Sequence, residues 1–203
     1  MRETHTEKTT ADTGNDFSGI VLAGGRSTRM GTDKTDLLID GRTFLENQVR
    51  KLQYLGAGEI LISGRSSSLP GTRSVPDLVP GLGPLGGLCS CFPTCGYASA
   101  LVISVDVPLL SVSTLEELLR AHQRGGFDAT ILAHNGRIQP LIAVYETDTF
   151  PLLQELTEGR RLAMRAYIER LRYQLFGFSG DPEELLNCNR PEDLARLRHK
   201  SNQ

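Results

Sequence analysis

The strongest constraint on the fold of this chain is an apolar run that stops at a pair of glycines. Residues 19–23 are largely apolar, and Gly24 and Gly25 follow at once. An uninterrupted apolar run of this length is typical of a strand that is buried on both faces of a parallel sheet. Glycine lets the backbone approach a ligand closely and leaves its N–H groups free for bonding. The segment therefore predicts a ligand-facing turn at the carboxyl end of a buried strand.

The loop after the glycine pair carries the cations Arg26, Arg29 and Lys34. Arginine neutralises phosphate oxygens with a planar fork and lysine does so as a point charge. The loop is not a Walker A loop, because the lysine comes three residues after Gly31, and it lacks the Gly-x-Gly-x-x-Gly dinucleotide fingerprint. It indicates a site for a polyphosphate, and an ordinary glycine turn with solvated cations is the alternative.

Beyond this loop the chain alternates between strand-like and helix-like segments. We expect strands at 19–23, 59–63, 98–105, 128–133, 141–145 and 173–178. We expect helices at 43–55, 86–92, 113–124 (with Ser113 as its N-cap), 149–157, 162–171 and 191–199. The stretch 64–87, rich in Gly, Pro and Ser, is expected to be a loop region. Such alternation predicts an α/β protein with a mostly parallel sheet covered by helices, in which ligands bind beyond the carboxyl ends of the strands.

Length and composition fit one domain of ordinary size. The chain has 203 residues, of which 39% are hydrophobic and 23% charged, and its formal net charge is −2. Residues 1–16 are polar and are expected to form a disordered tail, which leaves 17–203 as a single domain. The charge balance favours neither nucleic acid nor an anionic membrane as a partner. Without a long apolar run or a signal pattern, a cytoplasmic location is expected.

The four cysteines are candidates for a metal site. Cys89, Cys91 and Cys95 lie close together, and Cys188 lies far along the chain. Their C-x-C-x3-C spacing is not that of a zinc knuckle, and no histidine lies nearby. Free thiols are favoured over zinc, and a disulfide is not expected in a cytoplasmic protein.

Further candidate site residues follow the first loop. Asp106 comes directly after the apolar segment 98–105, where a carboxylate is well placed to bind Mg²⁺, although a turn aspartate is the alternative. The glycine-rich stretch 81–87 around Pro84 suggests a ligand-facing turn that leads into a helix. Asp77, just upstream, is placed to accept hydrogen bonds from a base or ribose. Asn189 before Pro191 is explained by helix capping alone.

Taken together, these segments resemble the molybdenum cofactor guanylyltransferase family. The resemblance spans about residues 19–197 and rests on segments that occur in this order: Leu22-Ala-Gly-Gly-x3-Arg29-Met30-Gly31-x-Asp33-Lys34, Gly83-Pro84-Leu85-x-Gly87, Asp106-x-Pro108, Gln139-Pro140-Leu141 and Asn187-x-Asn189-x-Pro191-x-Asp193-Leu194. The first segment marks the wider nucleotidyltransferase superfamily, and the later ones narrow it to this branch. Relatives that use CTP or UTP usually have alanine where this chain has Gly24.

The resemblance implies a three-layer αβα, Rossmann-like nucleotide-diphospho-sugar transferase fold, with Mg²⁺ as cofactor and Asp106 as its ligand. Its N-terminal part would bind GTP and its C-terminal part molybdopterin. The GTP-binding residues would be Leu22, Ala23, Gly24, Gly25, Lys34, Asp77 and Asp106. The pterin-binding residues would be Arg160, Arg161, Asn187 and Asn189. The catalytic residues would be Arg29, Lys34 and Asp106, whereas Arg26 is assigned no role.

The implied reaction joins GMP to the terminal phosphate of molybdopterin and releases pyrophosphate. The attacking phosphate is already anionic, so no general base is needed and Asp106 is expected to be a metal ligand. Molybdoenzyme chaperones or other proteins of cofactor biosynthesis are possible partners. The alternatives are a cytidylyltransferase for molybdopterin, a sugar- or polyol-phosphate nucleotidyltransferase, and a non-catalytic nucleotide-binding protein.

Overall fold

The structure is a computed structural model that describes residues 16–24, 34–79, 81–188 and 193. The proposed tail over 1–16, apart from Asp16, lies outside the described residues. So does the helix expected at 191–199, apart from Asp193. Among the described residues, no helix is long and apolar enough to cross a membrane.

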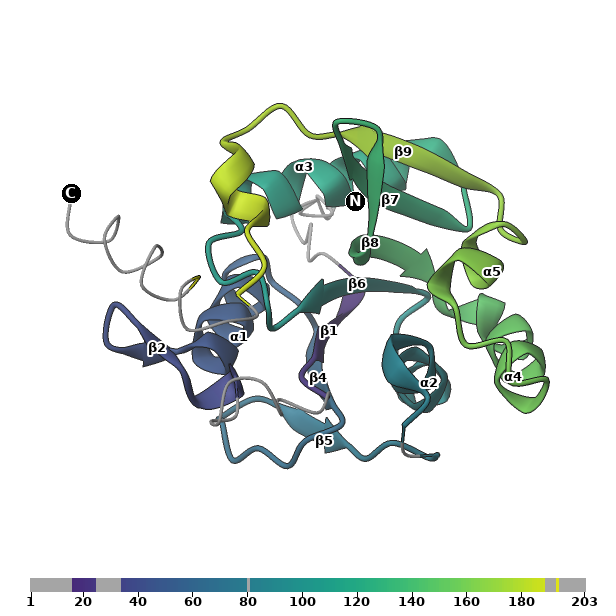
Figure 1. Cartoon of the computed structure of the whole chain (residues 1–203), viewed down its shortest axis with the longest axis horizontal. Coiled ribbons are helices and arrows are strands. Elements are labelled where there is room, and N and C mark those ends of the chain that lie inside the picture. The colour runs from purple at the N-terminus through teal and green to yellow at the C-terminus, as the bar shows by residue number, and fades with distance from the viewer. Residues whose placement is uncertain (1–15, 25–33, 80, 189–192, 194–203) are drawn as a thin grey trace, which may run out of the picture.

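A seven-stranded sheet runs through the centre of the molecule (Figure 1). In spatial order its strands are β5 (Arg73–Val75), β4 (Glu59–Ser63), β1 (Phe17–Leu22), β6 (Ser99–Ser104), β8 (Arg137–Glu146), β7 (Ala129–His134) and β9 (Tyr173–Gly177). The pairs β5–β4, β4–β1, β1–β6 and β7–β9 are parallel, whereas β8 pairs antiparallel with both β6 and β7. The expected mostly parallel sheet is confirmed.

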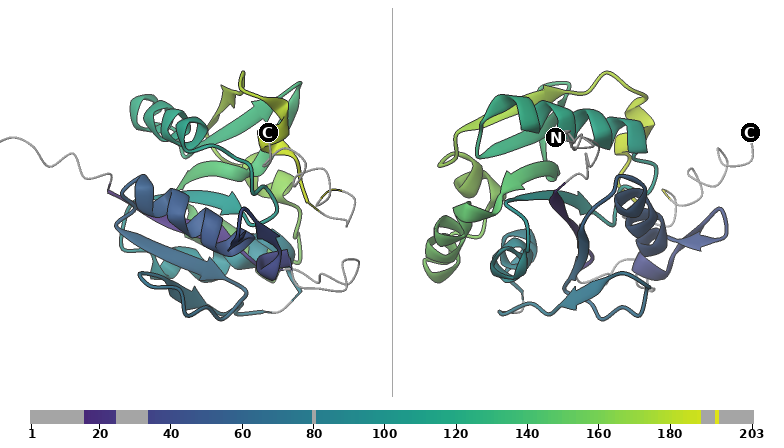
Figure 2. Two further views of the ribbon diagram at one scale, coloured as in Figure 1. Left: turned by 90° about the vertical axis from the view of Figure 1, so that its left-hand side faces the viewer. Right: turned by 180° about the vertical axis from the view of Figure 1, so that it is seen from behind.

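Helices cover both faces of this sheet (Figures 1 and 2). One buried cluster joins the sheet to α1 (Phe44–Tyr54) and α3 (Val112–Gly125). The other joins it to α2 (Gly83–Cys91), α4 (Phe150–Glu158) and α5 (Met164–Ile168). Strand β1 supplies both clusters, because its side chains alternate between the faces: Val21 belongs to the first cluster, and Ile20 and Leu22 to the second. The three-layer αβα arrangement is therefore also confirmed.

Short elements complete the fold. The small hairpin of β2 (Leu38–Ile39) and β3 (Arg42–Thr43) precedes α1. The described residues also form the 3₁₀ turns η1 (Lys34–Asp36), η2 (Phe92–Thr94), η3 (Thr147–Thr149) and η4 (Pro182–Leu185).

Several element boundaries differ from the sequence expectations. The Gly- and Pro-rich stretch 64–87 contains β5, which has only three residues and pairs with β4, and α2 begins inside it at Gly83. Strand β8 starts at Arg137, four residues before the expected segment 141–145, because the Asn135-Gly136 turn pairs it with β7 from its first residue. Helix α5 is shorter than 162–171, since Ala163 is extended and the helix ends at Ile168.

The prediction that Ser113 is the N-cap of α3 is wrong. Ser111 caps the helix, because its side-chain oxygen accepts the N–H of Thr114 at 3.1 Å. Ser113, the expected cap, lies inside the first turn, where its hydroxyl is 3.0 Å from that of Ser111. Both serines carry a hydroxyl that can cap a helix. Ser111 is the cap because its backbone is extended, whereas Ser113 is already helical.

Helix α1 begins with a capping box. The Thr43 hydroxyl accepts the Glu46 N–H at 3.1 Å, and the Glu46 carboxylate accepts the Thr43 N–H at 2.7 Å. These two bonds satisfy two of the backbone donors that a helix start leaves open. The Thr43 N–H, with the Thr43 hydroxyl that donates to the same carboxylate at 3.0 Å, lowers the pKa of Glu46.

We predict that Thr43→Ala lowers the free energy of unfolding by about 1 kcal/mol, because one end of the capping box is lost. Urea unfolding followed by circular dichroism measures the change. Thr43→Ser keeps the hydroxyl and is expected to stay within about 0.5 kcal/mol of the wild-type protein. Equal losses in the two variants would show that the hydroxyl is not what stabilises the helix start.

Candidate nucleotide site

A cavity of about 820 Å³ opens at the carboxyl ends of the parallel strands. Its walls come from β1 and β6 with the residues that follow them, from the end of β4, from the segment after β5, from α2 and from β8. The lining residues are Leu22, Gly24, Ser63, Asp77, Gly81, Gly83, Pro84, Gly87, Ser104, Val105, Asp106 and Leu141. Asp77 and Asp106 are the charged residues among the described lining residues.

The chain topology explains why the cavity lies here. From β1 the chain passes through α1 to β4 on one side, whereas from β6 it passes through α3 to the strands on the other side. Neighbouring parallel strands whose connections leave in opposite directions form a crevice at their carboxyl ends, and ligands bind there. Gly24 follows β1 and Asp106 follows β6, so they stand on either side of this crevice.

Three glycines let the backbone and side chains around the cavity come close together. A Cβ atom on Gly64, whose φ is +76°, would lie 2.7 Å from the Cα atom of Gly24. A Cβ atom on Gly87 would lie 2.6 Å from the Ser63 hydroxyl. That hydroxyl in turn donates to the Asp77 carboxylate at 3.4 Å. Side chains at Gly64 and Gly87 would therefore push the β1 turn, the β4 turn and α2 apart.

Helix α2 points its N-terminus at the cavity. Gly83 and Pro84 open the helix, and both line the cavity. No side chain caps this end among the described residues. The first-turn amides and the positive end of the helix dipole therefore face the cavity, which favours an anionic ligand. The glycine-rich turn expected from the sequence is confirmed as part of the cavity wall.

The segment that carries Asp106 is held by contacts from two directions. From α1, the buried Gln48 amide donates to the carbonyl oxygens of Ser104 and Val107 at 2.8 and 2.9 Å. From the C-terminal side, the N–H of the buried Cys188 donates to the carbonyl oxygen of Asp106 at 2.8 Å. Cys188, which lies between the two expected pterin-binding asparagines, is thus bonded directly to the backbone of the expected metal ligand.

Lys51 adds a second contact from α1. Its ammonium group donates to the Pro108 carbonyl at 2.7 Å and to the Gln48 side-chain oxygen at 3.0 Å. Burial lowers the pKa of Lys51 to about 7, and the nearby Glu184 carboxylate acts in the opposite direction. The sequence did not single out Lys51 or Gln48, because both stand in an ordinary helical pattern.

A bulge in β8 brings Leu141 into the cavity. Pairing with β7 jumps from Ala143 opposite Ile131 to Gln139 opposite Leu132, so the residues between Gln139 and Ala143 are extra on β8. The Tyr145 hydroxyl, which is fully buried, donates to the Pro140 carbonyl inside the bulge at 2.8 Å. Bulges re-aim side chains in this way next to functional sites.

The structure brings together some of the sequence-predicted residues. Leu22, Gly24, Asp77 and Asp106 all line the cavity. Ala23 does not line it but holds the turn, since its N–H donates to the Ser63 carbonyl at 3.2 Å. Gly25, Arg29 and Asn189, together with the side chain of Lys34, lie outside what the structure describes.

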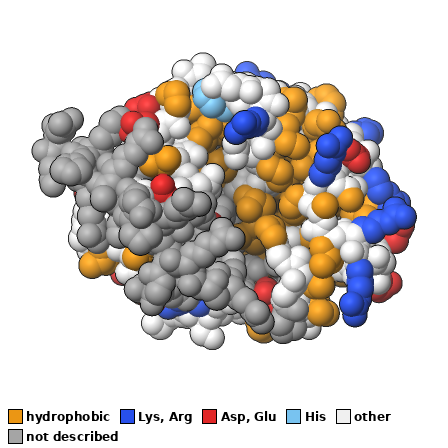
Figure 3. Space-filling view, in the orientation of Figure 1, with side chains coloured by type: hydrophobic (Ala, Val, Ile, Leu, Met, Phe, Trp, Pro, Cys, Tyr) orange, Lys and Arg blue, Asp and Glu red, His pale blue; other side chains and the backbone are white. Residues whose placement is uncertain are grey.

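The remaining predicted residues lie away from the lining of this cavity. Arg160 and Arg161 follow α4 and are exposed, as is Asn187. Figure 3 shows basic side chains along the edge of the molecule where Figure 1 places α4 and α5. The pterin-binding assignment of these residues stays a prediction. The sequence did not single out Ser63 and Ser104 as lining residues, although Ser63 ends a predicted strand and Ser104 lies one residue before the end of another.

Cys89, Cys91, Cys95 and Cys188 form no disulfide in the structure. Burial raises the pKa of Cys91 to about 12 and that of Cys95 to about 11, which keeps both as thiols. The described residues contain no group of three or more metal-binding side chains. Mg²⁺ needs no such group, because it binds through one or two carboxylates together with substrate phosphates. Asp106 at the cavity wall fits that requirement.

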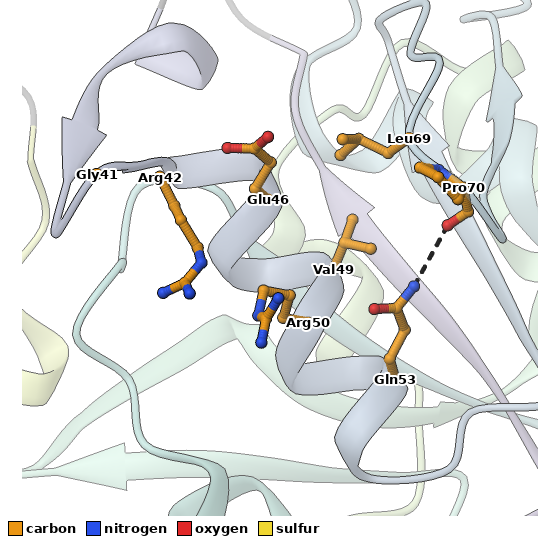
Figure 4. Close-up of a pocket in the computed structure, with 8 residues that line it drawn as sticks. All are labelled: Gly41, Arg42, Glu46, Val49, Arg50, Gln53, Leu69 and Pro70. Atoms are coloured by element: carbon orange, nitrogen blue, oxygen red, sulfur yellow. Dashed lines mark hydrogen bonds between the residues drawn. The ribbon is translucent and has the colours of Figure 1, made fainter.

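A second, smaller pocket of about 310 Å³ lies on the outer side of α1 (Figure 4). It is lined by Gly41, Arg42, Glu46, Val49, Arg50, Gln53, Leu69 and Pro70. The ends of the parallel strands take no part in its lining, so it is separate from the candidate site.

A switch-point crevice with a glycine turn, a helix N-terminus and a carboxylate is the architecture of a nucleotidyltransferase, and comparison with known proteins agrees. Residues 19–174 match the model of the MobA-like NTP transferase domain. The protein called molybdenum cofactor guanylyltransferase in Xanthomonas euvesicatoria is 34% identical over 189 residues, which cover 91% of this chain and 96% of that protein. The chain therefore belongs to the molybdenum cofactor guanylyltransferase family, within the MobA-like nucleotidyltransferases.

Solved structures show the same fold. The molybdopterin-guanine dinucleotide biosynthesis protein A of Archaeoglobus fulgidus superposes with a TM-score of 0.78 at 23% identity, covering 92% of this chain and 99% of that one. The 2-C-methyl-D-erythritol 4-phosphate cytidylyltransferase of Thermus thermophilus has a TM-score of 0.67 at 19% identity, covering 93% of this chain and 100% of that one.

We predict that Gly64→Ala destabilises the protein more than Gly71→Ala. Both glycines have positive φ, +76° and +73°, so both variants incur strain of about 1–2 kcal/mol. Only at Gly64 does the new methyl group meet backbone, and we expect this to cost a further ~1–3 kcal/mol. Urea unfolding of the two variants measures the difference, and equal losses would contradict the close packing of the two turns.

We also predict that Lys51→Met flattens the pH dependence of stability between about pH 7 and pH 10. The folded pKa of about 7 lies below the unfolded value of about 10.4, so the unfolded chain binds more protons in this range and this lysine makes stability rise with pH. Urea unfolding at several pH values tests this, with Arg50→Met as an exposed control. Parallel curves for Lys51→Met and the control would argue against a buried amine.

Proposed function

We propose that this protein transfers GMP from GTP to the terminal phosphate of molybdopterin, releasing pyrophosphate and forming molybdopterin guanine dinucleotide. The observation that carries the proposal is the cavity at the β1–β6 switch point, with Gly24 and Asp106 on its two sides. Family membership supplies the reaction, since the Xanthomonas relative is called a molybdenum cofactor guanylyltransferase. We also propose that the reaction takes place in the cytoplasm.

The donor side of the proposed site is the N-terminal half of the sheet. The turn from Leu22 to Gly25 would hold the base and phosphates of GTP, and Asp77 would contact guanine or ribose. The N-terminus of α2 supports this placement, because its first-turn amides face the same cavity. Arg29 and Lys34 would neutralise the phosphates as pyrophosphate leaves.

The acceptor side is proposed for the C-terminal part of the chain, through Arg160, Arg161, Asn187 and Asn189. The bond from the Cys188 N–H to the Asp106 carbonyl supports a place for the asparagine segment beside the site. A molybdoenzyme chaperone or another protein of cofactor biosynthesis is the partner we propose for the product.

The chemistry asks mainly for positioning and charge neutralisation. The attacking phosphate oxygen is already anionic, so no side chain has to remove a proton from it. Asp106, together with phosphate oxygens, would hold Mg²⁺, which when bound stabilises charge on the phosphates. The described lining contributes backbone amides at glycine turns and a helix N-terminus, and these groups would orient the phosphates.

The proposal is tested by incubating the protein with molybdopterin, Mg²⁺ and each of GTP, CTP, ATP and UTP. The mass of the intact pterin product and the release of pyrophosphate are measured. We expect a pterin dinucleotide product with GTP and no product with CTP, ATP or UTP. A cytidine product would favour the cytidylyltransferase alternative, and tight nucleotide binding without any product would favour a non-catalytic protein.

We predict that Asp106→Asn and Lys34→Ala each lower turnover about 10²-fold or more, because each removes a charge that the phosphates require. Thermal unfolding of both variants is expected to remain close to that of the wild-type protein. Asp148→Asn removes an exposed carboxylate in η3 and serves as the control. Near-normal turnover by folded Asp106→Asn protein would exclude Asp106 from the metal site.

A further inference from the structure

The geometry points to Gln48 and Lys51 of α1 as positioning residues for Asp106. Neither residue lines the cavity, yet between them they bind three backbone carbonyls around Asp106. We infer that they hold the Asp106 carboxylate where it can bind a metal–nucleotide complex. This inference rests on the proposed role of Asp106 as a metal ligand.

The first step in the argument is the Gln48 amide. Its side chain is fully buried, and its single NH₂ group donates to the carbonyls of Ser104 and Val107, which flank Asp106 on both sides. Strand β6 ends at Ser104, so these carbonyls belong to a segment that has just left the sheet. A buried carbonyl without a partner is costly, and the Gln48 amide removes that cost for one particular loop conformation.

Lys51 fixes which way the Gln48 amide points. Lys51 carries N–H donors, and the Gln48 side-chain oxygen accepts one of them at 3.0 Å. The NH₂ group is thereby directed at the Asp106 segment. Lys51 also binds that segment directly, through the Pro108 carbonyl at 2.7 Å. The two side chains thus form one unit, one helical turn apart on the same face of α1.

The opposite side of the segment is held by the C-terminal part of the chain. The Cys188 N–H binds the Asp106 carbonyl, and the Glu184 carboxylate accepts the Ser111 N–H at 2.9 Å and the Thr114 hydroxyl at 2.8 Å. The backbone of the segment is therefore restrained from α1 and from the C-terminal part at once. The Asp106 side chain is left on the cavity wall.

Helix α1 also connects this segment to the donor side of the site. The Phe44 N–H at the start of α1 binds the Leu37 carbonyl at 2.9 Å, directly after η1, which begins at Lys34. One helix therefore spans from the chain segment of a proposed phosphate-binding lysine to the segment of the proposed metal ligand. A rigid helix with contacts at both places keeps their separation constant.

The other faces of α1 supply matched controls. Figure 4 shows Gln53 reaching the Pro70 carbonyl on the outer side of the helix, at 3.3 Å. This is the same amide-to-carbonyl bond as that of Gln48, made to a loop outside the candidate site. Figure 4 also shows Arg50 on that outer region, as an exposed cation next in sequence to Lys51.

The experiment compares Gln48→Leu and Lys51→Met with the controls Gln53→Leu and Arg50→Met. Hydrogen exchange of the peptide that covers residues 104–110, measured by mass spectrometry without metal or nucleotide, reports the loop itself. We expect exchange about fivefold to tenfold faster in the two test variants, as the loss of one or two hydrogen bonds implies. The controls are expected to match the wild-type protein in this peptide.

The second readout is the binding of Mn²⁺ with GTP, followed by electron paramagnetic resonance. Its dissociation constant is expected to rise about fivefold to tenfold in the test variants and not in the controls. In the transfer assay, the Mg²⁺ concentration for half-maximal rate is expected to rise by the same factor, whereas kcat at saturating Mg²⁺ changes less than about threefold. A general loss of stability would not produce this division between metal requirement and kcat.

Several results would overturn the inference. Unchanged exchange in folded Gln48→Leu or Lys51→Met protein would show that the pair does not hold the loop. Faster exchange with unchanged Mn²⁺ binding would reduce the pair to a structural role. Because the two residues are changed separately, one folded variant suffices. Absence of GMP transfer by the wild-type protein would instead refute the proposed function, and exchange and Mn²⁺ binding would still decide this inference.

Discussion

The parallel pairing of β1 between β4 and β6 is the interaction on which the rest of the structure depends. Strand β1 is buried on both faces. Its pairing sets Leu22 beside Ser63 on one side and beside Ser104 on the other. Because the register is fixed, the residues that follow each strand reach the same edge of the sheet. The glycine turn, Asp77 and Asp106 come from distant parts of the chain, and this pairing is what brings them to one cavity.

Close packing of backbone then gives that edge its shape. Gly24 and Gly64 touch across the ends of β1 and β4, and Gly87 brings α2 against Ser63. These contacts leave no volume for side chains between the turns and place the helix N-terminus at the cavity. A ligand there would meet amides and two carboxylates, and the cations expected for its phosphates belong to the loop that follows Gly24 in sequence.

The sequence was sufficient for the parts of the fold that depend on local pattern. The apolar runs that became β1, β4 and β6 were recognisable because both faces of each strand are buried, and Asp106 was recognisable because it ends such a run. The sequence did not predict strand β5, because three residues are too few to show the alternation of a strand. Gln48 and Lys51 escaped notice because their importance comes from a tertiary contact with carbonyl groups, and a sequence does not show which carbonyls a helix will meet.

The bond between the Cys188 N–H and the Asp106 carbonyl has a consequence for how the chain can be divided. The parallel strands β5, β4, β1 and β6 supply every strand end that lines the cavity. This part of the sheet therefore looks as if it could be moved into another protein by itself. A fragment that stopped short of Cys188 would keep those strands and lose the donor that sets the backbone of Asp106. The N-terminal and C-terminal parts of the chain therefore meet at the backbone of Asp106, and exchanging one part between relatives requires that this contact be matched as well.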